Sequence, residues 1–135
     1  MDTSVLIAAL YSQLGTAYRL LSLVGTRKFD INLSVPLVLE YEDVAKRMSD
    51  EFGLTLTALD DIIDYLCSVA VRHQIHYLWR PVLPDPKDDM VLEVAVAGRC
   101  DAIITYNYKD FRGAEQFGVR ILKPVEFLAQ IGVSL

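Results

Sequence analysis

The sequence predicts an α/β protein with a three-layer α/β/α architecture, in which helices cover both faces of a mostly parallel central sheet. The first observation is that short apolar runs typical of buried strands alternate with longer segments of helical periodicity. The second is that the 135 residues contain no internal repeat, low-complexity tract or linker. We therefore expect residues 1–135 to form a single domain around one core.

The amino-terminal part of the chain is predicted to be helical. The segment Val5–Tyr11 is strongly apolar, and either Asp2 or Ser4 can cap the helix that it forms. Gly15 allows a bend before a second helix over 16–24. Helix capping alone explains Asp2 and Ser4 about as well as a catalytic role does.

A strand and a long helix are expected next. Apolar and polar residues alternate over Lys28–Ser34, which is typical of a strand. Pro36 stands at the start of a helix that we expect to extend to about Met48. Glu40 falls on the polar side of this helix, and on the pattern alone a solvated helix face is the better explanation for it.

The helix over 59–70 has the most regular apolar stripe in the chain. The segment Thr57–Asp60 resembles a capping box at its start. We assign the acids of its first turns to helix stability, because the helix dipole favours negative charge there; they are Asp60, Asp61 and Asp64. A strand over 75–78 should follow. His73 and His76 flank this boundary without a cysteine partner nearby, which does not favour a zinc site.

The stretch Asp85–Asp89 has the features of a helix start. Asp85 can cap the helix, Pro86 suits its first position, and Asp88 falls three residues after the cap. Gly98 is expected to end this helix. The pattern therefore predicts a helix whose first turn carries several carboxylates.

The rest of the chain predicts two more strands and a closing helix. The strands are expected over 101–105 and 119–122, and Pro124 opens a helix that runs to about 131. A polar, aromatic loop over 106–111 follows the first of these strands. Functional sites in parallel sheets lie outside the carboxyl ends of the strands. The polar residues that we expect near that edge are Asp2, Glu40, Asp88, Thr105, Asn107 and Asp110.

Composition narrows the class of protein. A hydrophobic content of 53% excludes a disordered chain, and no apolar run approaches the roughly 18 residues of a membrane span. No signal peptide is evident, so a cytoplasmic location is expected. Cys67 and Cys100 fit two reduced thiols. A net charge of −5 argues against nucleic-acid binding through bulk positive charge, but a metal-binding acidic cluster would still permit a nuclease.

Five segments, in order, resemble segments of the PIN domain family over nearly the whole chain. They are Asp2–Leu6, Glu40–Tyr41, Asp85–Asp89 with the following Leu92, Glu93 and Ala95, Ile103–Phe111, and Ile121–Leu128. The resemblance implies a metal-dependent ribonuclease that hydrolyses RNA phosphodiester bonds. Such a ribonuclease is most often the toxin of a toxin–antitoxin pair. The partners that the resemblance implies are RNA, a cognate antitoxin protein and a second copy of the chain.

The resemblance also assigns roles to particular residues. It implies that Asp2, Glu40 and Asp88 bind Mg²⁺ or Mn²⁺ as catalytic carboxylates. The fourth position, which is Asp in many relatives, falls on Asn107, and Asp110 can substitute as a metal ligand and catalytic residue. Relatives usually carry a short apolar strand before the first aspartate. Here only Met1 precedes it, so we expect either a start further upstream or the loss of the central strand.

The expected substrate contacts are basic and hydroxyl side chains near the acids. They are Ser4, Thr105, Lys87 and Lys109, with Arg80 and Arg112 as further basic groups. Tyr106 and Tyr108 can stack on bases, although ordinary loop packing explains them equally well.

Two alternatives remain on the sequence alone. The first is a catalytically inactive PIN-like module that binds protein or RNA, which the neutral Asn107 favours. The second is a flavodoxin-like or receiver domain. Such a domain should have an Asp-Asp pair after the first strand and a lysine after the last, and neither is clear here.

Overall fold

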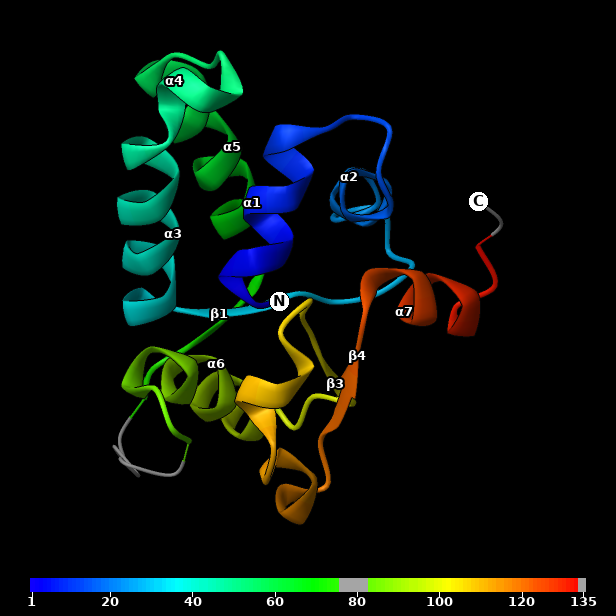
Figure 1. The fold of residues 1–135 in the computed structure, drawn as a ribbon. Helices are drawn as coiled ribbons and strands as arrows, with labels where there is room; N and C mark the ends of the chain where they lie inside the picture. The colour runs from blue at the N-terminus through cyan, green and yellow to red at the C-terminus, as the bar shows by residue number, and fades with distance from the viewer. Residues whose placement is uncertain (76–82, 134–135) are drawn as a thin grey trace.

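The structure is a computed structural model that describes residues 1–75 and 83–133. The helices are α1 (Thr3–Tyr11), α2 (Thr16–Ser22), α3 (Val35–Arg47), α4 (Ser49–Phe52), α5 (Leu56–Val69), α6 (Pro86–Ala97) and α7 (Pro124–Gln130). The strands are β1 (Asn32–Ser34), β2 (Val71–His73), β3 (Ala102–Ile104) and β4 (Arg120–Leu122), and two 3₁₀ turns are η1 (Tyr108–Phe111) and η2 (Ala114–Phe117). Helices and parallel strands alternate along the chain, which confirms the predicted α/β class (Figure 1).

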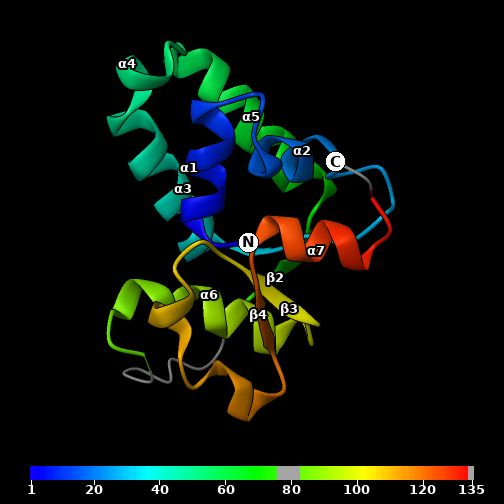
Figure 2. The same cartoon turned by 45° about the vertical axis from the view of Figure 1, so that its right-hand side comes forward.

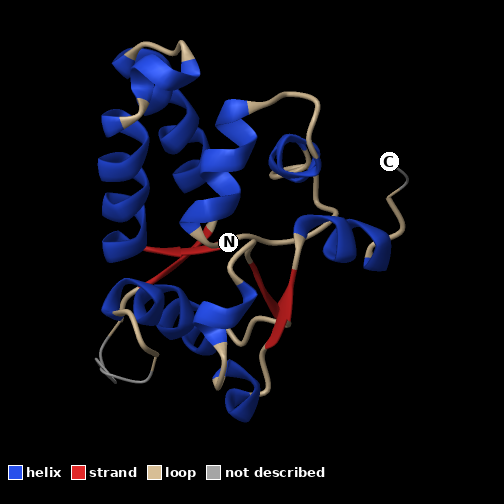
Figure 3. Cartoon of the chain, in the orientation of Figure 1, coloured by secondary structure: helices blue, strands red, loops and turns tan. Residues whose placement is uncertain are grey.

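The described strands form two separate parallel pairs. β1 pairs with β2, with Leu33 opposite Arg72, and β3 pairs with β4, with Ile103 opposite Ile121. The two pairs stand apart in Figure 3. The strands are therefore parallel, as expected, but they do not join into one hydrogen-bonded sheet.

The predicted start of the first strand is wrong, because β1 begins at Asn32 rather than at residue 28. A strand that was not expected, β2 at Val71–His73, precedes the one expected over 75–78. The chain enters β2 early because Ala70 is already extended and the backbone N–H of Val71 donates to Ile31 O at 2.9 Å. Ile75 lies outside any strand, and residues 76–78 fall outside the described part of the chain.

The predicted start of α5 is also shifted. Thr55 rather than Thr57 caps the helix, since its hydroxyl accepts a hydrogen bond of 3.0 Å from the backbone N–H of Ala58. The short helix α4 precedes it and ends at Gly53, whose φ of +68° is in the left-handed region that favours glycine. The apolar stripe of α5 is buried as predicted at Leu59, Ile63 and Leu66.

The hydrophobic core connects the helices to both strand pairs. α1, α3 and α5 lie on one side of β1 and α6 lies on the other, where α6 contacts β1 and β3 (Figure 2). The largest fully buried side chains include Leu6, Leu33, Tyr41, Leu92 and Phe111. Burial of each such side chain contributes about 1.5–3 kcal/mol, so the fold depends on these contacts more than on helix propensity. None of the described helices has the length and apolar character needed to cross a membrane.

Gly98 ends α6 for a reason that the sequence pattern did not show. Its φ of −86° is ordinary, so it is not a left-handed stop. A Cβ atom at this position would lie 2.7 Å from Asn32 Oδ1 and 2.8 Å from His73 Nε2. These two atoms are themselves hydrogen-bonded at 2.7 Å, while His76 lies outside the described residues. Glycine therefore allows the end of α6 to approach β1 and β2 closely.

Candidate active site

Asp2 is held at the junction between α1 and β3. It stands just before α1 with only 5% of its surface exposed. Its Oδ2 atom accepts hydrogen bonds of 2.7 Å from both Ser4 Oγ and Thr105 Oγ1. Its backbone N–H donates to Ile104 O at 2.8 Å. The carboxylate is thus oriented by two hydroxyl groups rather than used as a helix cap.

Thr105 connects this carboxylate to the loop that follows β3. It is fully buried, and its backbone N–H donates to Leu122 O at 2.9 Å. Its hydroxyl also accepts a hydrogen bond of 2.9 Å from the backbone N–H of Asn107. Likewise, Ser4 Oγ accepts one of 3.2 Å from the backbone N–H of Tyr106. The loop is therefore folded back over Asp2 at the carboxyl end of β3, which is the edge where the sequence placed the site.

Asp88 lies in the first turn of α6 and is half-buried. The helix begins as predicted, because Asp85 accepts a hydrogen bond of 2.9 Å from the backbone N–H of Lys87. Burial, and then the negative charges of Asp2, Asp110, Asp85 and Asp89, raise the pKa of Asp88 to about 7. The structure thus brings the Asp88 carboxylate within electrostatic range of Asp2, which precedes α1, and of Asp110 in η1.

The two candidates for the fourth ligand position that the resemblance implies, Asn107 and Asp110, are exposed residues of the loop after β3. Asn107 precedes η1, and the backbone N–H of Asp110 donates to its carbonyl oxygen at 3.0 Å. The charge on Asp110 contributes to the raised pKa of Asp88, which the neutral Asn107 side chain does not. Asp110 is thus the member of the pair that adds negative charge to the site.

Glu40 is the predicted acid that the structure connects least to the others. It is half-buried in α3, beside the fully buried Tyr41, whose hydroxyl donates to Met1 O. Its charge is not among those that raise the pKa of Asp88.

The carboxylates have the right chemistry for a hard divalent cation but do not form a complete cage. Mg²⁺ and Mn²⁺ prefer oxygen ligands such as those of Asp2 and Asp88. A cation would offset the burial and the repulsion between carboxylates that together raise the Asp88 pKa. However, across residues 1–75 and 83–133 no three His, Cys, Asp or Glu side chains are grouped closely enough to hold a metal ion. The side chains present fit such an ion in ligand type, and water would have to complete its coordination.

Several predicted substrate contacts lie near these acids. Lys87 follows the cap of α6 and Lys109 lies in η1, and both side chains are exposed. Tyr106 and Tyr108 are also exposed, at 39% and 48%, and the Tyr106 hydroxyl lies 3.2 Å from Thr16 Oγ1. Arg112 is exposed, whereas Arg80 lies outside the described residues.

Sequence reasoning did not single out Asp89. Only 2% of its surface is exposed, and its Oδ1 atom accepts a hydrogen bond of 2.9 Å from the backbone N–H of Leu83. The available signal was the pair of adjacent aspartates at the start of α6. Successive helical residues point about 100° apart, so Asp88 and Asp89 could not both point in the same direction.

Comparison with known proteins assigns the chain to a family. A family profile described as PIN domain matches residues 1–109, which include Asp2, Glu40, Asp88 and Asn107. No curated protein and no solved structure matches the chain. The chain therefore belongs to the PIN domain family, whose members are nuclease-type domains.

Proposed function

We propose that this protein is a metal-dependent endoribonuclease that hydrolyses RNA phosphodiester bonds, with Mg²⁺ or Mn²⁺ bound between Asp2 and Asp88. The observation that carries the proposal is the electrostatic coupling of these two carboxylates, which come from distant parts of the chain. A bound divalent ion would neutralise the phosphate and make a water molecule more acidic. The raised pKa of Asp88 is of the kind that clusters at functional sites, and a positive charge beside Asp88 would stabilise its ionised form.

The hydrogen-bond network around Asp2 supports a role in holding the ion. Ser4 and Thr105 both donate to Oδ2, and no hydrogen bond to Oδ1 comes from the described part of the chain. The carboxylate is therefore oriented before any ligand arrives, with one oxygen available. Such preorganisation reduces the free energy that binding spends on ordering side chains.

Glu40 and Asp110 are proposed as further ligands, and Asn107 as a residue that orients a water molecule. Asp110 is supported by its electrostatic influence on Asp88. Asn107 is supported by its position beside Thr105, to which its backbone N–H is bonded. For Glu40 the support is the family match together with its half-buried position on α3.

RNA is proposed to approach along the loop after β3. The exposed ammonium groups of Lys87 and Lys109 would contact phosphates and position the strand. The exposed rings of Tyr106 and Tyr108 would stack on bases, which is tolerant of sequence. Local positive charge beside the acidic site would compensate for a net charge of −5.

An antitoxin protein and a second copy of the chain are proposed as partners, in keeping with a toxin of a toxin–antitoxin pair. Large apolar side chains exposed on α1 and α5 and in the turn between α1 and α2 support a protein partner, since exposed apolar surface is typical of interfaces. They include Tyr11, Leu14, Leu56 and Tyr65.

A catalytically inactive binding module is the second candidate. It is favoured by the neutral Asn107 and by the lack of three grouped ligand side chains in residues 1–75 and 83–133. Such a module would bind RNA or protein without Mn²⁺.

Calorimetric titration with Mn²⁺ separates the two candidates. The chain, Asp88→Asn and the control Asp85→Asn should be compared, because Asn keeps the helix cap at residue 85. We expect saturable binding by the chain and by the control, and none by Asp88→Asn. Cleavage of a single-stranded RNA by the chain should then require Mn²⁺ or Mg²⁺ and stop with EDTA. Absence of Mn²⁺ binding by the chain, together with retained RNA binding, would favour the inactive module.

A further inference from the structure

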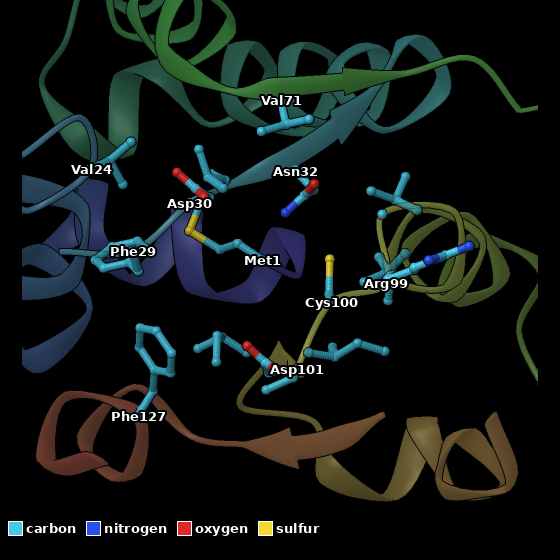
Figure 4. Close-up of a pocket in the computed structure, with 18 of the residues that line it drawn as sticks. Met1, Val24, Phe29, Asp30, Asn32, Val71, Arg99, Cys100, Asp101 and Phe127 are labelled. Carbon is cyan, nitrogen blue, oxygen red and sulfur yellow. The ribbon is translucent and has the colours of Figure 1, made fainter. Parts of the chain in front are cut away.

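Two hollows in the described part of the chain differ in the charges that line them. A cavity of about 530 Å³ lies between the two strand pairs (Figure 4). Lys28 and Arg99 line it together with Asp30 and Asp101, so charge does not select a class of ligand there. A pocket of about 650 Å³ lies among the helices α1, α2, α4 and α5 (Figure 1). Its lining is more selective.

Four aromatic rings, one from each of these helices, line the pocket among the helices. They are Tyr11 of α1, Tyr18 of α2, Phe52 of α4 and Tyr65 of α5. The rings of Tyr11 and Phe52 are nearly perpendicular, with an interplanar angle of 86° and centroids 5.0 Å apart. The other apolar lining residues are Ala9, Leu10, Leu21, Leu54, Ile62 and Leu66. The pocket therefore combines an apolar wall with several ring surfaces at different angles.

Hydrogen bonds hold two of these rings in place. The Tyr11 hydroxyl donates to Glu51 Oε2, which connects the end of α1 to α4. The Tyr65 hydroxyl donates to Val24 O at 3.0 Å, which connects α5 to the turn after α2. The ring positions are thus fixed by contacts within the protein, and a ligand would spend little free energy on ordering them.

Asp61 carries the single charge among the described residues that line the pocket. The sequence pattern assigned this acid to the stability of the helix start, but α5 begins at Leu56, so Asp61 lies in the second turn, where the helix dipole has little effect. Its neighbour Asp60 pairs with Lys46 at 2.8 Å. Asp61 itself has no ion pair or hydrogen bond with any residue that the structure describes. It stands four residues before Tyr65, so the two side chains lie on the same face of α5.

An organic cation matches this combination of side chains. The face of an aromatic ring carries negative potential and attracts an ammonium group, and Asp61 adds a full negative charge without a basic lining residue to oppose it. A metal ion matches poorly, because hard cations need several oxygen ligands and Asp61 is the single lining carboxylate. A volume of about 650 Å³ with mostly apolar and aromatic lining and few polar groups is typical of sites for small molecules.

We propose that the pocket among α1, α2, α4 and α5 binds a small organic ammonium ligand, with its cationic group beside Asp61 and the aromatic rings and its apolar body along the rest of the lining. Neither Asp2 nor Asp88 lines this pocket. Binding therefore requires no divalent metal ion and does not depend on the proposed nuclease activity.

Titration with matched small molecules, without added metal, tests this inference. Hexyltrimethylammonium is the main probe, and tetramethylammonium has the same cationic group without the apolar body. Choline is compared with dimethylbutanol, a neutral alcohol of the same shape in which a carbon atom replaces the charged nitrogen. Calorimetry measures the affinities, and NMR of the tyrosine rings locates the bound molecule. We expect hexyltrimethylammonium to bind at least about tenfold more tightly than tetramethylammonium, and choline about tenfold more tightly than dimethylbutanol.

Variants of the lining assign the binding to this pocket. Asp61→Asn keeps the side-chain shape and removes the charge, and Asp64→Asn is the control, because Asp64 is an exposed acid of the same helix that does not line the pocket. The preference for choline over dimethylbutanol should fall by about threefold or more in Asp61→Asn and stay unchanged in Asp64→Asn. Tyr18→Leu should also reduce this preference, whereas Tyr18→Phe keeps a ring and should retain it.

Three outcomes would overturn the proposal. The first is no binding of hexyltrimethylammonium, or NMR changes confined to residues outside the pocket. The second is equal affinity for choline and dimethylbutanol, which would make the pocket an apolar contact surface of the kind that suits a protein partner. The third is an equal loss in Asp61→Asn and Asp64→Asn, which would show attraction of cations to the net charge of −5 rather than to a site.

Discussion

The hydroxyl group of Thr105 donates a hydrogen bond of 2.7 Å to the carboxylate of Asp2, which joins the end of β3 to the start of α1. Both residues are buried, at 0% and 5% exposure. Replacing Thr105 with Val keeps the side-chain shape and removes this donor. We expect a loss of about 1–3 kcal/mol in the free energy of unfolding and weaker Mn²⁺ binding. Chemical denaturation and calorimetry measure the two effects, and Thr105→Ser should retain most of both. A Val variant with unchanged Mn²⁺ affinity would contradict the orienting role.

Asp88 should make stability depend on pH. Its pKa in the folded state is raised to about 7, whereas an unfolded Asp titrates near 3.9. The folded state therefore binds more protons between these values, and the stability that protonation contributes is full below about pH 4 and is lost as pH rises through about 7. Asp88→Asn should be more stable than the unmodified chain at about pH 8, with the difference small near pH 4.

Thermal unfolding without metal, at several pH values, checks this expectation. Asp85→Asn serves as the control, because Asp85 is exposed and its charge raises the pKa of Asp88 less than burial, Asp2 and Asp110 do; its stability should therefore depend less on pH. A stability difference for Asp88→Asn that does not change with pH would show that Asp88 is already ionised well below pH 7.

Changing the charges of Asn107 and Asp110 in turn tests which of the two contributes to metal binding. Asn107→Asp adds a carboxylate at the position beside Thr105 and should raise Mn²⁺ affinity, by about tenfold if it contributes one charged ligand. Asp110→Asn removes a charge that acts on Asp88, so it should lower Mn²⁺ affinity and also lower the Asp88 pKa. Calorimetry measures the affinities, and carboxyl NMR measures the pKa. If Asp110→Asn leaves both unchanged, Asp110 is only a surface acid of η1.

The exposed tyrosines of the loop after β3 should act on RNA and not on the metal. Tyr106→Ala and Tyr108→Ala should each lose about 1–3 kcal/mol of single-stranded RNA binding, while the Phe variants should keep most of it because they keep a ring for stacking. Fluorescence anisotropy with labelled RNA measures this loss. Mn²⁺ affinity should stay the same in all four variants. Equal RNA affinity of Ala and Phe variants would assign the rings to loop packing.

Gly98 should be intolerant of even a methyl group. A Cβ there would lie 2.7 Å from Asn32 Oδ1, so Gly98→Ala should destabilise the fold by about 1–3 kcal/mol. Asn32→Ala removes one of the two atoms in the way and leaves the other, His73 Nε2, without this hydrogen bond and able to move. The double variant should therefore be more stable than the sum of the two single losses predicts. Additive losses in chemical denaturation would show that the clash is not the cause.

The predictions that the structure confirms rest on patterns among residues that are close in the sequence. The cap at Asp85, the proline after it and the acid three residues on predicted the start of α6 correctly. The buried positions Leu59, Ile63 and Leu66 of α5 were predicted correctly for the same reason, since helical periodicity is visible within a few turns, whereas Val69 at the end of the predicted stripe is exposed. The placement of Asp2 and Thr105 at one edge followed from the expectation that parallel strands end together.

Other features needed the folded chain. The bounds of β2 depend on where Val71 meets Ile31, and the role of Gly98 depends on the approach of α6 to Asn32, neither of which is visible in local sequence. The sequence shows which acids are present but not which of them interact. Only the packing of α6 against the loop after β3 shows that the charge of Asp110 acts on Asp88. The charge of Glu40 is not among those that raise the pKa of Asp88. Local conformational preferences depend on neighbouring side chains, whereas distances between groups that are remote in sequence depend on how whole elements pack. The separation of the described strands into two pairs, with a cavity between them, is of this second kind.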